Sequence, residues 1–250
     1  YPKIQYIPYP KVGTINPAAR IGVIDLSTRD VSWMPIPGDQ RDNYLPRMEW
    51  IDETRLAIQQ LNRLQNQLFV HVANVVNSQV DVVLTEKDDA WIDIHDTLHW
   101  LADRSQFAWL SERDGWQHVY LASVESKTIK PVTSGGFDVT EILGIDDDAQ
   151  WIYFYASPAN ATQLYLYRVH FDGSDLQRVT PETETGTHRY VLSPDRKLAL
   201  VTSSSLMSPP VTTVVRLSDH ATQFVAEANS RLRDQLKTAK LPKSEFFRVD

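Results

Sequence analysis

Short runs of aromatic and β-branched residues alternate along the chain with clusters of Asp, Gly, Ser and Pro. Such runs are typical of β-strands, and such clusters are typical of the turns between them. One pattern recurs four times: a strand opened by Gln or Thr, a turn, and a second strand that closes on Val-Thr or a similar pair. The copies are 67–72 with 82–85, 117–122 with 130–133, 163–168 with 177–180, and 213–217 with 223–225. Their opening residues lie 50, 46 and 50 positions apart, close to the roughly 40–50-residue periods of propeller blades.

Two further short strands precede each copy, namely 44–50 with 55–61, 97–101 with 106–110, 139–145 with 151–155, and 188–192 with 198–201. Four strands per repeat predict an all-β fold, a partial β-propeller of about four four-stranded blades. A further strand pair at 21–26 and 31–35 resembles part of a preceding blade, so we expect the chain to be part of a longer protein. Because blades pack through both faces, we expect Trp50, Trp100 and Trp151 to be buried.

The one helical pattern follows the last blade, at residues 227–237, where Leu232 and Leu236 are spaced i, i+4 and Asn229 or Ser230 can cap the start. The pattern therefore divides the chain into three parts. Residues 1–20 form a proline-rich arm that leads into the propeller, residues 21–226 form the blades, and residues 227–250 form a short C-terminal helix and a linker.

Composition narrows the class of partner and cofactor. The net charge of −7 argues against nucleic acid as a partner, and no apolar run approaches the roughly 18 residues that span a membrane. The chain has no cysteine, which excludes disulfides and Cys-ligated metals, and nothing in the sequence calls for a cofactor. Absence of cysteine fits cytoplasm and bacterial periplasm alike. We expect a bacterial source, with the periplasm favoured.

Three segments that are acidic or contain histidine have the residue types of metal ligands. His95 and His99 are spaced i, i+4, but in a turn and strand that spacing separates them by about 13 Å, so we expect no metal site there. Residues 88–89 and 146–148 are acidic without the alternating ligand spacing of a calcium loop, and we expect them to be inter-strand turns.

Five motifs occur along the chain in the same order as in a known protein family. They are 9–17 (YPKVGTINP), 61–66 (LNRLQN), 111–120 (SERDGWQHVY), 187–188 (TH) followed by 193–195 (SPD), and 241–247 (LPKSEFF). The chain resembles the dipeptidyl peptidase IV family of serine peptidases, in the β-propeller that precedes the catalytic domain. The resemblance covers essentially the whole chain and corresponds to about the second half of that propeller.

The resemblance implies an eight-bladed propeller that caps an α/β-hydrolase domain, which removes N-terminal dipeptides with Pro or Ala in second place. It also implies that the catalytic Ser, Asp and His follow Asp250 and that the paired glutamates for the substrate's ammonium group precede Tyr1. None of the nine glycines belongs to a Gly-x-Ser-x-Gly elbow. We therefore expect no catalytic residue in this segment and no peptidase activity from it alone.

By resemblance, the loop after an Ala-Trp dipeptide reaches the substrate cavity. The matching stretch is 90–96, so Trp91, His95 and Asp96 are the candidate substrate-binding residues. The family's aromatic-Arg pair is His95-Asp96 here, which departs from the family pattern.

The proline-rich start of the chain is the candidate for self-association. Three prolines among residues 1–11 disfavour a central strand. The resemblance implies an arm that pairs with a second subunit, with Tyr1, Ile4, Tyr6 and Tyr9 as the candidate contacts. A homo-oligomer is expected. The function expected is a propeller that gates access of a peptide substrate and supports dimerisation. The alternative is a stand-alone propeller that binds peptides or proteins.

Overall fold

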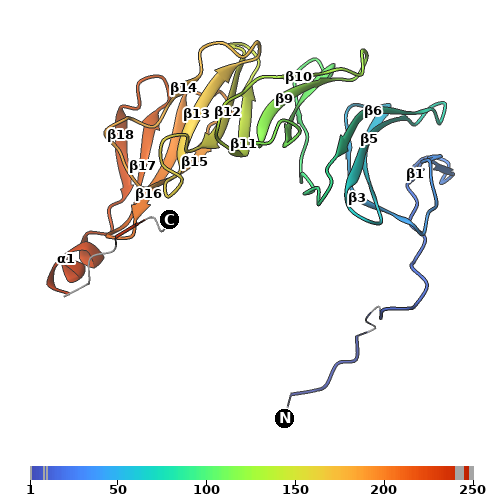
Figure 1. The fold of residues 1–250 in the computed structure, drawn as a ribbon, viewed down its shortest axis with the longest axis horizontal. Coiled ribbons are helices and arrows are strands. Elements are labelled where there is room, and N and C mark those ends of the chain that lie inside the picture. Colours follow the sequence, from blue (N-terminus) through green and yellow to red (C-terminus); the bar gives the residue numbers. More distant parts are fainter. Residues whose placement is uncertain (1, 8, 10, 240–244, 248–250) are drawn as a thin grey trace. The chain divides into compact units, whose positions relative to one another are not determined.

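The computed structural model describes residues 2–7, 9, 11–239 and 245–247. Within them lie four four-stranded antiparallel sheets, β3–β6, β7–β10, β11–β14 and β15–β18, and the two-stranded sheet β1–β2 (Figure 1). The expected four blades and short C-terminal helix are confirmed. The bounds are β1 Gly22–Ile24, β2 Val31–Trp33, β3 Asn43–Trp50, β4 Arg55–Asn62, β5 Gln67–Asn74, β6 Val80–Lys87, β7 His99–Trp100, β8 Gln106–Ser111, β9 His118–Ser123, β10 Ile129–Pro131, β11 Val139–Asp146, β12 Trp151–Ala156, β13 Tyr165–His170, β14 Gln177–Arg178, β15 Thr187–Leu192, β16 Leu198–Ser205, β17 Ser208–Arg216, β18 Thr222–Glu227 and α1 Ser230–Thr238.

The chain divides into two compact units, residues 1–96 and 97–250. In the first unit, the β1–β2 hairpin packs on one face of sheet β3–β6. Met34, just after β2, shares a buried cluster with Leu56 and Ile58 of β4 and Ala73 of β5. Cross-strand pairing explains this cluster, because Leu56 opposes Ala73 and therefore points to the same face.

In the second unit, three sheets lie side by side, and the middle one has both faces buried (Figure 1). Ile152 and Phe154 of β12 pack against sheet β7–β10. Tyr153 and Tyr155, which alternate with them, pack against sheet β15–β18. Because successive residues of a strand point to opposite faces, a strand between two sheets must be apolar at every position. This accounts for the unbroken apolar run of residues 151–156.

Most turns between strands are closed by an acidic side chain, as expected for the acidic clusters. Asp88 Oδ1 accepts hydrogen bonds from the backbone N–H groups of Ala90 at 2.7 Å and Trp91 at 3.1 Å. Asp146 Oδ1 accepts one from the Ala149 N–H at 3.0 Å. These carboxylates satisfy turn amides that the ladder leaves unpaired.

The expected burial of Trp50 is wrong, because its side chain is 54% exposed. It ends β3, which is an edge strand of its sheet. Trp100 and Trp151 are half-buried, and Trp100 packs on Phe107 with ring centroids 4.9 Å apart. The fully buried tryptophan is Trp109, in the second strand of its blade. That strand has a hydrogen-bonded neighbour on each side, whereas an edge strand has one.

The helix begins at Ser230, three residues later than the pattern predicts, since Glu227 still belongs to β18. Asn229 is the N-cap residue, but its side chain donates to the Pro210 carbonyl at 2.7 Å instead of capping the helix. None of the described helices is long and apolar enough to cross a membrane.

One polar chain runs through the core of the first unit. His71, in β5, is 1% exposed, and its Nε2 lies 2.7 Å from Gln60 Oε1. The Gln60 amide nitrogen donates in turn to the Pro37 carbonyl at 2.7 Å. Burial lowers the pKa of His71 from 6.5 to about 4. The native state therefore holds this imidazole neutral.

We expect Gly186→Ala to destabilise the chain strongly. Gly186 has φ +104°, and an added Cβ would lie 2.4 Å from the Ser204 carbonyl oxygen. The alanine variant therefore has both backbone strain and a steric clash. Gly115→Ala is the matched control, since Gly115 has φ +97° and an added Cβ there meets no atom within 4 Å. Denaturant unfolding should show a loss of about 3 kcal/mol or more for Gly186→Ala and about 1 kcal/mol for Gly115→Ala. Equal losses would contradict the clash.

We also expect stability to fall as the pH falls from 6.5 towards 4. The unfolded chain binds a proton at His71 near pH 6.5, and the native state binds it only near pH 4. Stability is therefore complete above pH 6.5, and about 3 kcal/mol of it is lost by pH 4. Urea unfolding of the wild type and of His71→Phe at both pH values measures this loss of unfolding free energy. In the variant, the part of the loss that comes from protonation of His71 should be absent. An unchanged pH dependence in the variant would contradict the assignment.

Candidate substrate-contact loop and a buried polar network

The candidate substrate-contact stretch, residues 90–96, lies in the loop 88–96, which follows β6 and is held by the turn between β4 and β5. The Asp88 N–H donates to the Asn66 carbonyl at 3.1 Å, and the Ile92 N–H donates to the Gln65 carbonyl at 2.9 Å. Ile92 is buried. The turn itself is shaped by Asn62, whose Oδ1 accepts from two of its backbone amides. The 61–66 motif that resembles the peptidase family is thus the support for this loop.

Asp96 ends the loop in an ion pair with Arg47 of β3. Arg47 Nε donates to Asp96 Oδ1 at 2.9 Å, and its Nη2 contacts the same oxygen. The side chains are 46% and 79% exposed, so water screens the pair and its contribution to stability is small. The geometry nevertheless places a guanidinium group at the end of the loop.

Arg47 is the residue that the sequence reasoning missed. Its signal is Pro46 within a strand, because a proline there marks an edge or a bulge. The β3–β4 register indeed shifts between Tyr44 and Arg47. A bulge re-aims a side chain, and this one is associated with Arg47 turning to the loop.

The other two predicted site residues lie differently. The His95 carbonyl accepts a hydrogen bond from Gln59 Nε2 at 2.8 Å, and its side chain is half-buried. Trp91 is 54% exposed, and its indole N–H donates to Asp93 Oδ1 at 3.1 Å. The structure therefore brings Asp96 to Arg47 and His95 to Gln59, and it leaves the Trp91 ring facing solvent. Such a surface can stack on and ion-pair with an extended peptide.

The candidate arm residues that the structure describes are all strongly exposed, Ile4 at 77%, Tyr6 at 92% and Tyr9 at 85%. Tyr1 lies outside the described residues. Further along the chain, Asn16 Nδ2 donates to the Arg41 carbonyl at 3.2 Å. The motif at 241–247 also falls largely outside the described residues.

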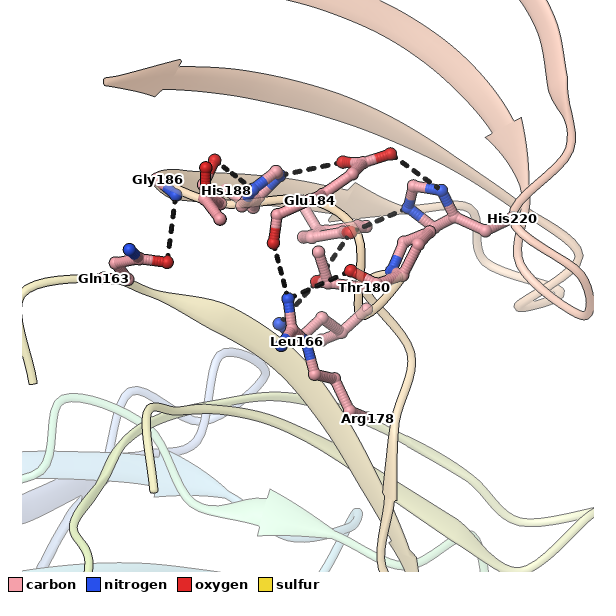
Figure 2. A network of polar contacts seen from close by, with 11 residues as sticks. Gln163, Leu166, Arg178, Thr180, Glu184, Gly186, His188 and His220 are labelled. Atoms are coloured by element: carbon pink, nitrogen blue, oxygen red, sulfur yellow. Dashed lines mark hydrogen bonds and ion pairs between the residues drawn. The ribbon is translucent and has the colours of Figure 1, made fainter. Parts of the chain in front are cut away.

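A second cluster of polar side chains lies between sheets β11–β14 and β15–β18 (Figure 2). Tyr190 Oη lies 2.8 Å from Thr180 Oγ1 and 2.8 Å from His220 Nε2. Glu184 lies between the two imidazoles, 3.4 Å from His188 Nδ1 and 3.9 Å from His220 Nδ1. The cluster thus ties the loop before β15 to the turn between β17 and β18.

This network has the chemistry of a structural junction. Burial lowers the pKa of His188 and of His220, and Glu184 opposes both shifts. Burial also raises the pKa of the Tyr190 hydroxyl well above its usual range. Arg178 completes the junction by donating to the Glu184 carbonyl at 2.7 Å. In the described part of the chain, no three His, Cys, Asp or Glu residues form a group that could hold a metal ion.

Comparison with known proteins gives consistent matches. The family model of the dipeptidyl peptidase IV N-terminal region matches residues 1–210. The dipeptidyl peptidase 4 proteins of Trichophyton equinum and Arthroderma otae are 24% identical over 269 residues and 25% identical over 270 residues. Each match covers the whole chain and 33% of the relative. The crystal structure of Porphyromonas gingivalis dipeptidyl peptidase 4 superposes with a TM-score of 0.81 at 26% identity, over 92% of this chain and 32% of that one.

The chain therefore spans about a third of the length of the relatives that it matches. The family model covers well over half of the residues, and the structural match extends to the same sheet-rich architecture. This chain belongs to the family of the dipeptidyl peptidase IV N-terminal region.

Proposed function

We propose that the chain is the substrate-gating propeller portion of a dipeptidyl peptidase IV-like serine peptidase, with catalysis in an α/β-hydrolase domain outside these residues. The family match carries this proposal. Relatives that are about three times as long are named dipeptidyl peptidases. The sequence contains no Gly-x-Ser-x-Gly nucleophile elbow, on which the catalytic serine of such a hydrolase lies.

Loop 88–96 is the part proposed to meet the peptide. Support comes from its exposed Trp91 ring and from the Arg47–Asp96 pair at its end. The loop itself is held by backbone hydrogen bonds from Asp88 and Ile92 to the β4–β5 turn. Rigid aromatic and charged groups of this kind bind an extended peptide at little cost in side-chain entropy. The resemblance implies an arginine where this chain has Asp96. We propose that the guanidinium group of Arg47 in β3 takes the place of that arginine.

The arm is proposed to pair with a second copy of the protein. Support comes from three large side chains that are each more than three-quarters exposed on a segment assigned to no strand. Apolar side chains in that number are typical of an interaction surface. The alternative function, a stand-alone propeller that binds peptides, would use the same loop without any catalytic domain.

The substrate proposal predicts a difference between long and short substrates. In the full-length protein, Trp91→Ala should raise KM for an Ala-Pro hexapeptide by roughly fivefold, because about 1 kcal/mol of aromatic contact is lost. The KM for the Gly-Pro anilide, which is too short to reach the loop, should not change. Trp116→Ala is the matched control, with a ring that is 45% exposed on another turn.

The same assays separate the two functions. Residues 1–250 alone should hydrolyse neither substrate, while the full-length protein should do so and be blocked by a serine-directed inhibitor. A full-length protein without activity would favour the stand-alone module. Equal KM changes for both substrates would contradict the role of the loop.

The arm proposal predicts weaker self-association when its apolar side chains are removed. Ile4→Ser, Tyr6→Ser and Tyr9→Ser together should raise the dimer dissociation constant of the full-length protein at least about tenfold. Sedimentation velocity over a concentration series measures it. Leu64→Ser with Val76→Ser is the control, since both residues are exposed on blade turns. An unchanged constant in the arm variant would exclude the arm as the contact.

A further inference from the structure

The end of loop 88–96 is held by side chains from two neighbouring strands of the preceding sheet. Gln59, in β4, is 3% exposed, and its Nε2 donates to the His95 carbonyl at 2.8 Å. Arg47, in β3, donates from Nε to Asp96 Oδ1 at 2.9 Å. Two consecutive residues of the loop are therefore bound, the first through its backbone and the second through its side chain.

The two residues that hold the loop are a cross-strand pair. Arg47 lies directly opposite Gln59 in the pairing of β3 with β4, so both side chains are on one face of the sheet. Tyr44 and Arg47 are three positions apart on β3, whereas their partners on β4 are two apart. This extra residue places Arg47, rather than Pro46, opposite Gln59. The bulge in β3 therefore creates the pair.

The contact with the loop explains why position 59 is a glutamine. A carbonyl oxygen only accepts hydrogen bonds, so the atom of Gln59 that faces the His95 carbonyl is the amide nitrogen. Gln59 Oε1 is buried without a hydrogen-bond partner among the described residues, which costs stability. Val70, the partner of Gln59 on β5, is apolar and 0% exposed. Packing of the sheet alone would therefore favour an apolar side chain at position 59.

Gln60, the next residue of β4, provides a comparison within the same strand. It is 6% exposed, and its Nε2 donates to the Pro37 carbonyl at 2.7 Å. Successive residues of a strand point to opposite faces, so the two glutamines serve different sides of the sheet. Both are buried and bind a backbone carbonyl, but Gln59 binds the candidate loop and Gln60 binds the segment before β3.

We propose that Gln59 is a positioning residue for peptide binding, which acts through loop 88–96 and touches no substrate itself. This inference rests on the proposed function, in which the loop meets the peptide. With its end held by Gln59 and Arg47, the loop presents Trp91 and Asp96 in one arrangement, so peptide binding does not have to order it. Loss of the Gln59 donor therefore weakens the binding of long peptides and leaves the chemical step unchanged.

The first test is hydrogen exchange of the full-length protein, measured by mass spectrometry. Gln59→Met keeps the length of the side chain and removes the donor. It should speed amide exchange in residues 88–96 about fivefold and leave residues 37–43 unchanged. Gln60→Met is the matched control and should do the reverse. Because Gln60 also faces His71, a general loss of stability would be at least as large in the control. Equal exchange of residues 88–96 in the two variants would overturn the proposal.

The second test is kinetic and uses the same two variants. Gln59→Met should raise KM for the Ala-Pro hexapeptide roughly two- to tenfold, with kcat and the KM for the Gly-Pro anilide unchanged. Gln60→Met should change none of these values. Because Gln59 acts through the loop, its combination with Trp91→Ala should raise KM by less than the product of the two single effects.

The outcomes separate this inference from the proposed function. An unchanged hexapeptide KM in Trp91→Ala would remove the role of the loop itself. A raised KM in Trp91→Ala, together with an unchanged KM in folded Gln59→Met, would overturn the positioning role alone. If Gln59→Met does not fold, Arg47→Met, at a side chain that is 46% exposed, takes its place in the exchange measurement. Unchanged exchange of residues 88–96 in that variant would then overturn the proposal.

Discussion

Burial of both faces of the middle sheet, β11–β14, is the constraint on which the packing of the second unit depends. In the second unit, Phe154 packs towards one neighbouring sheet and Tyr155 towards the other, so neither face of the middle blade can be polar. A blade with two buried faces has only its turns and strand ends free to vary. Function in such a blade is therefore confined to loops and strand ends, and the candidate loop 88–96 is such a segment.

The polar groups inside these sheets differ in how far they are satisfied. Tyr190 is paired with Thr180 and His220, so its network adds specificity to the packing of two blades. His71 hydrogen-bonds through Nε2, and its buried Nδ1 has no hydrogen-bond partner among the described residues. A buried imidazole that is kept neutral costs stability at low pH.

Much of the fold follows from the sequence, because strand pattern and turn chemistry are local. The repeat at Gln67, Gln117, Gln163 and Thr213 predicts the four sheets that the structure contains. Which residues of a strand are buried is harder to predict from the sequence. Trp50 ends an edge strand and is exposed, whereas Trp109 lies in an inner strand and is buried, and the order of strands within a sheet cannot be seen in a local pattern. The pattern also places the start of the helix three residues too early, since β18 continues through Glu227 before the helix begins.

The candidate site shows the same division between local and non-local information. Trp91, His95 and Asp96 are adjacent in sequence, so a resemblance can point to them together. Arg47 is 49 residues away, and it joins them through a bulge in β3. The resemblance implies a basic residue in this loop, where the chain has Asp96, and the guanidinium that lies beside Asp96 comes from Arg47 of β3. A pattern followed along the loop does not reveal such a contact, because the two residues meet only in the folded chain.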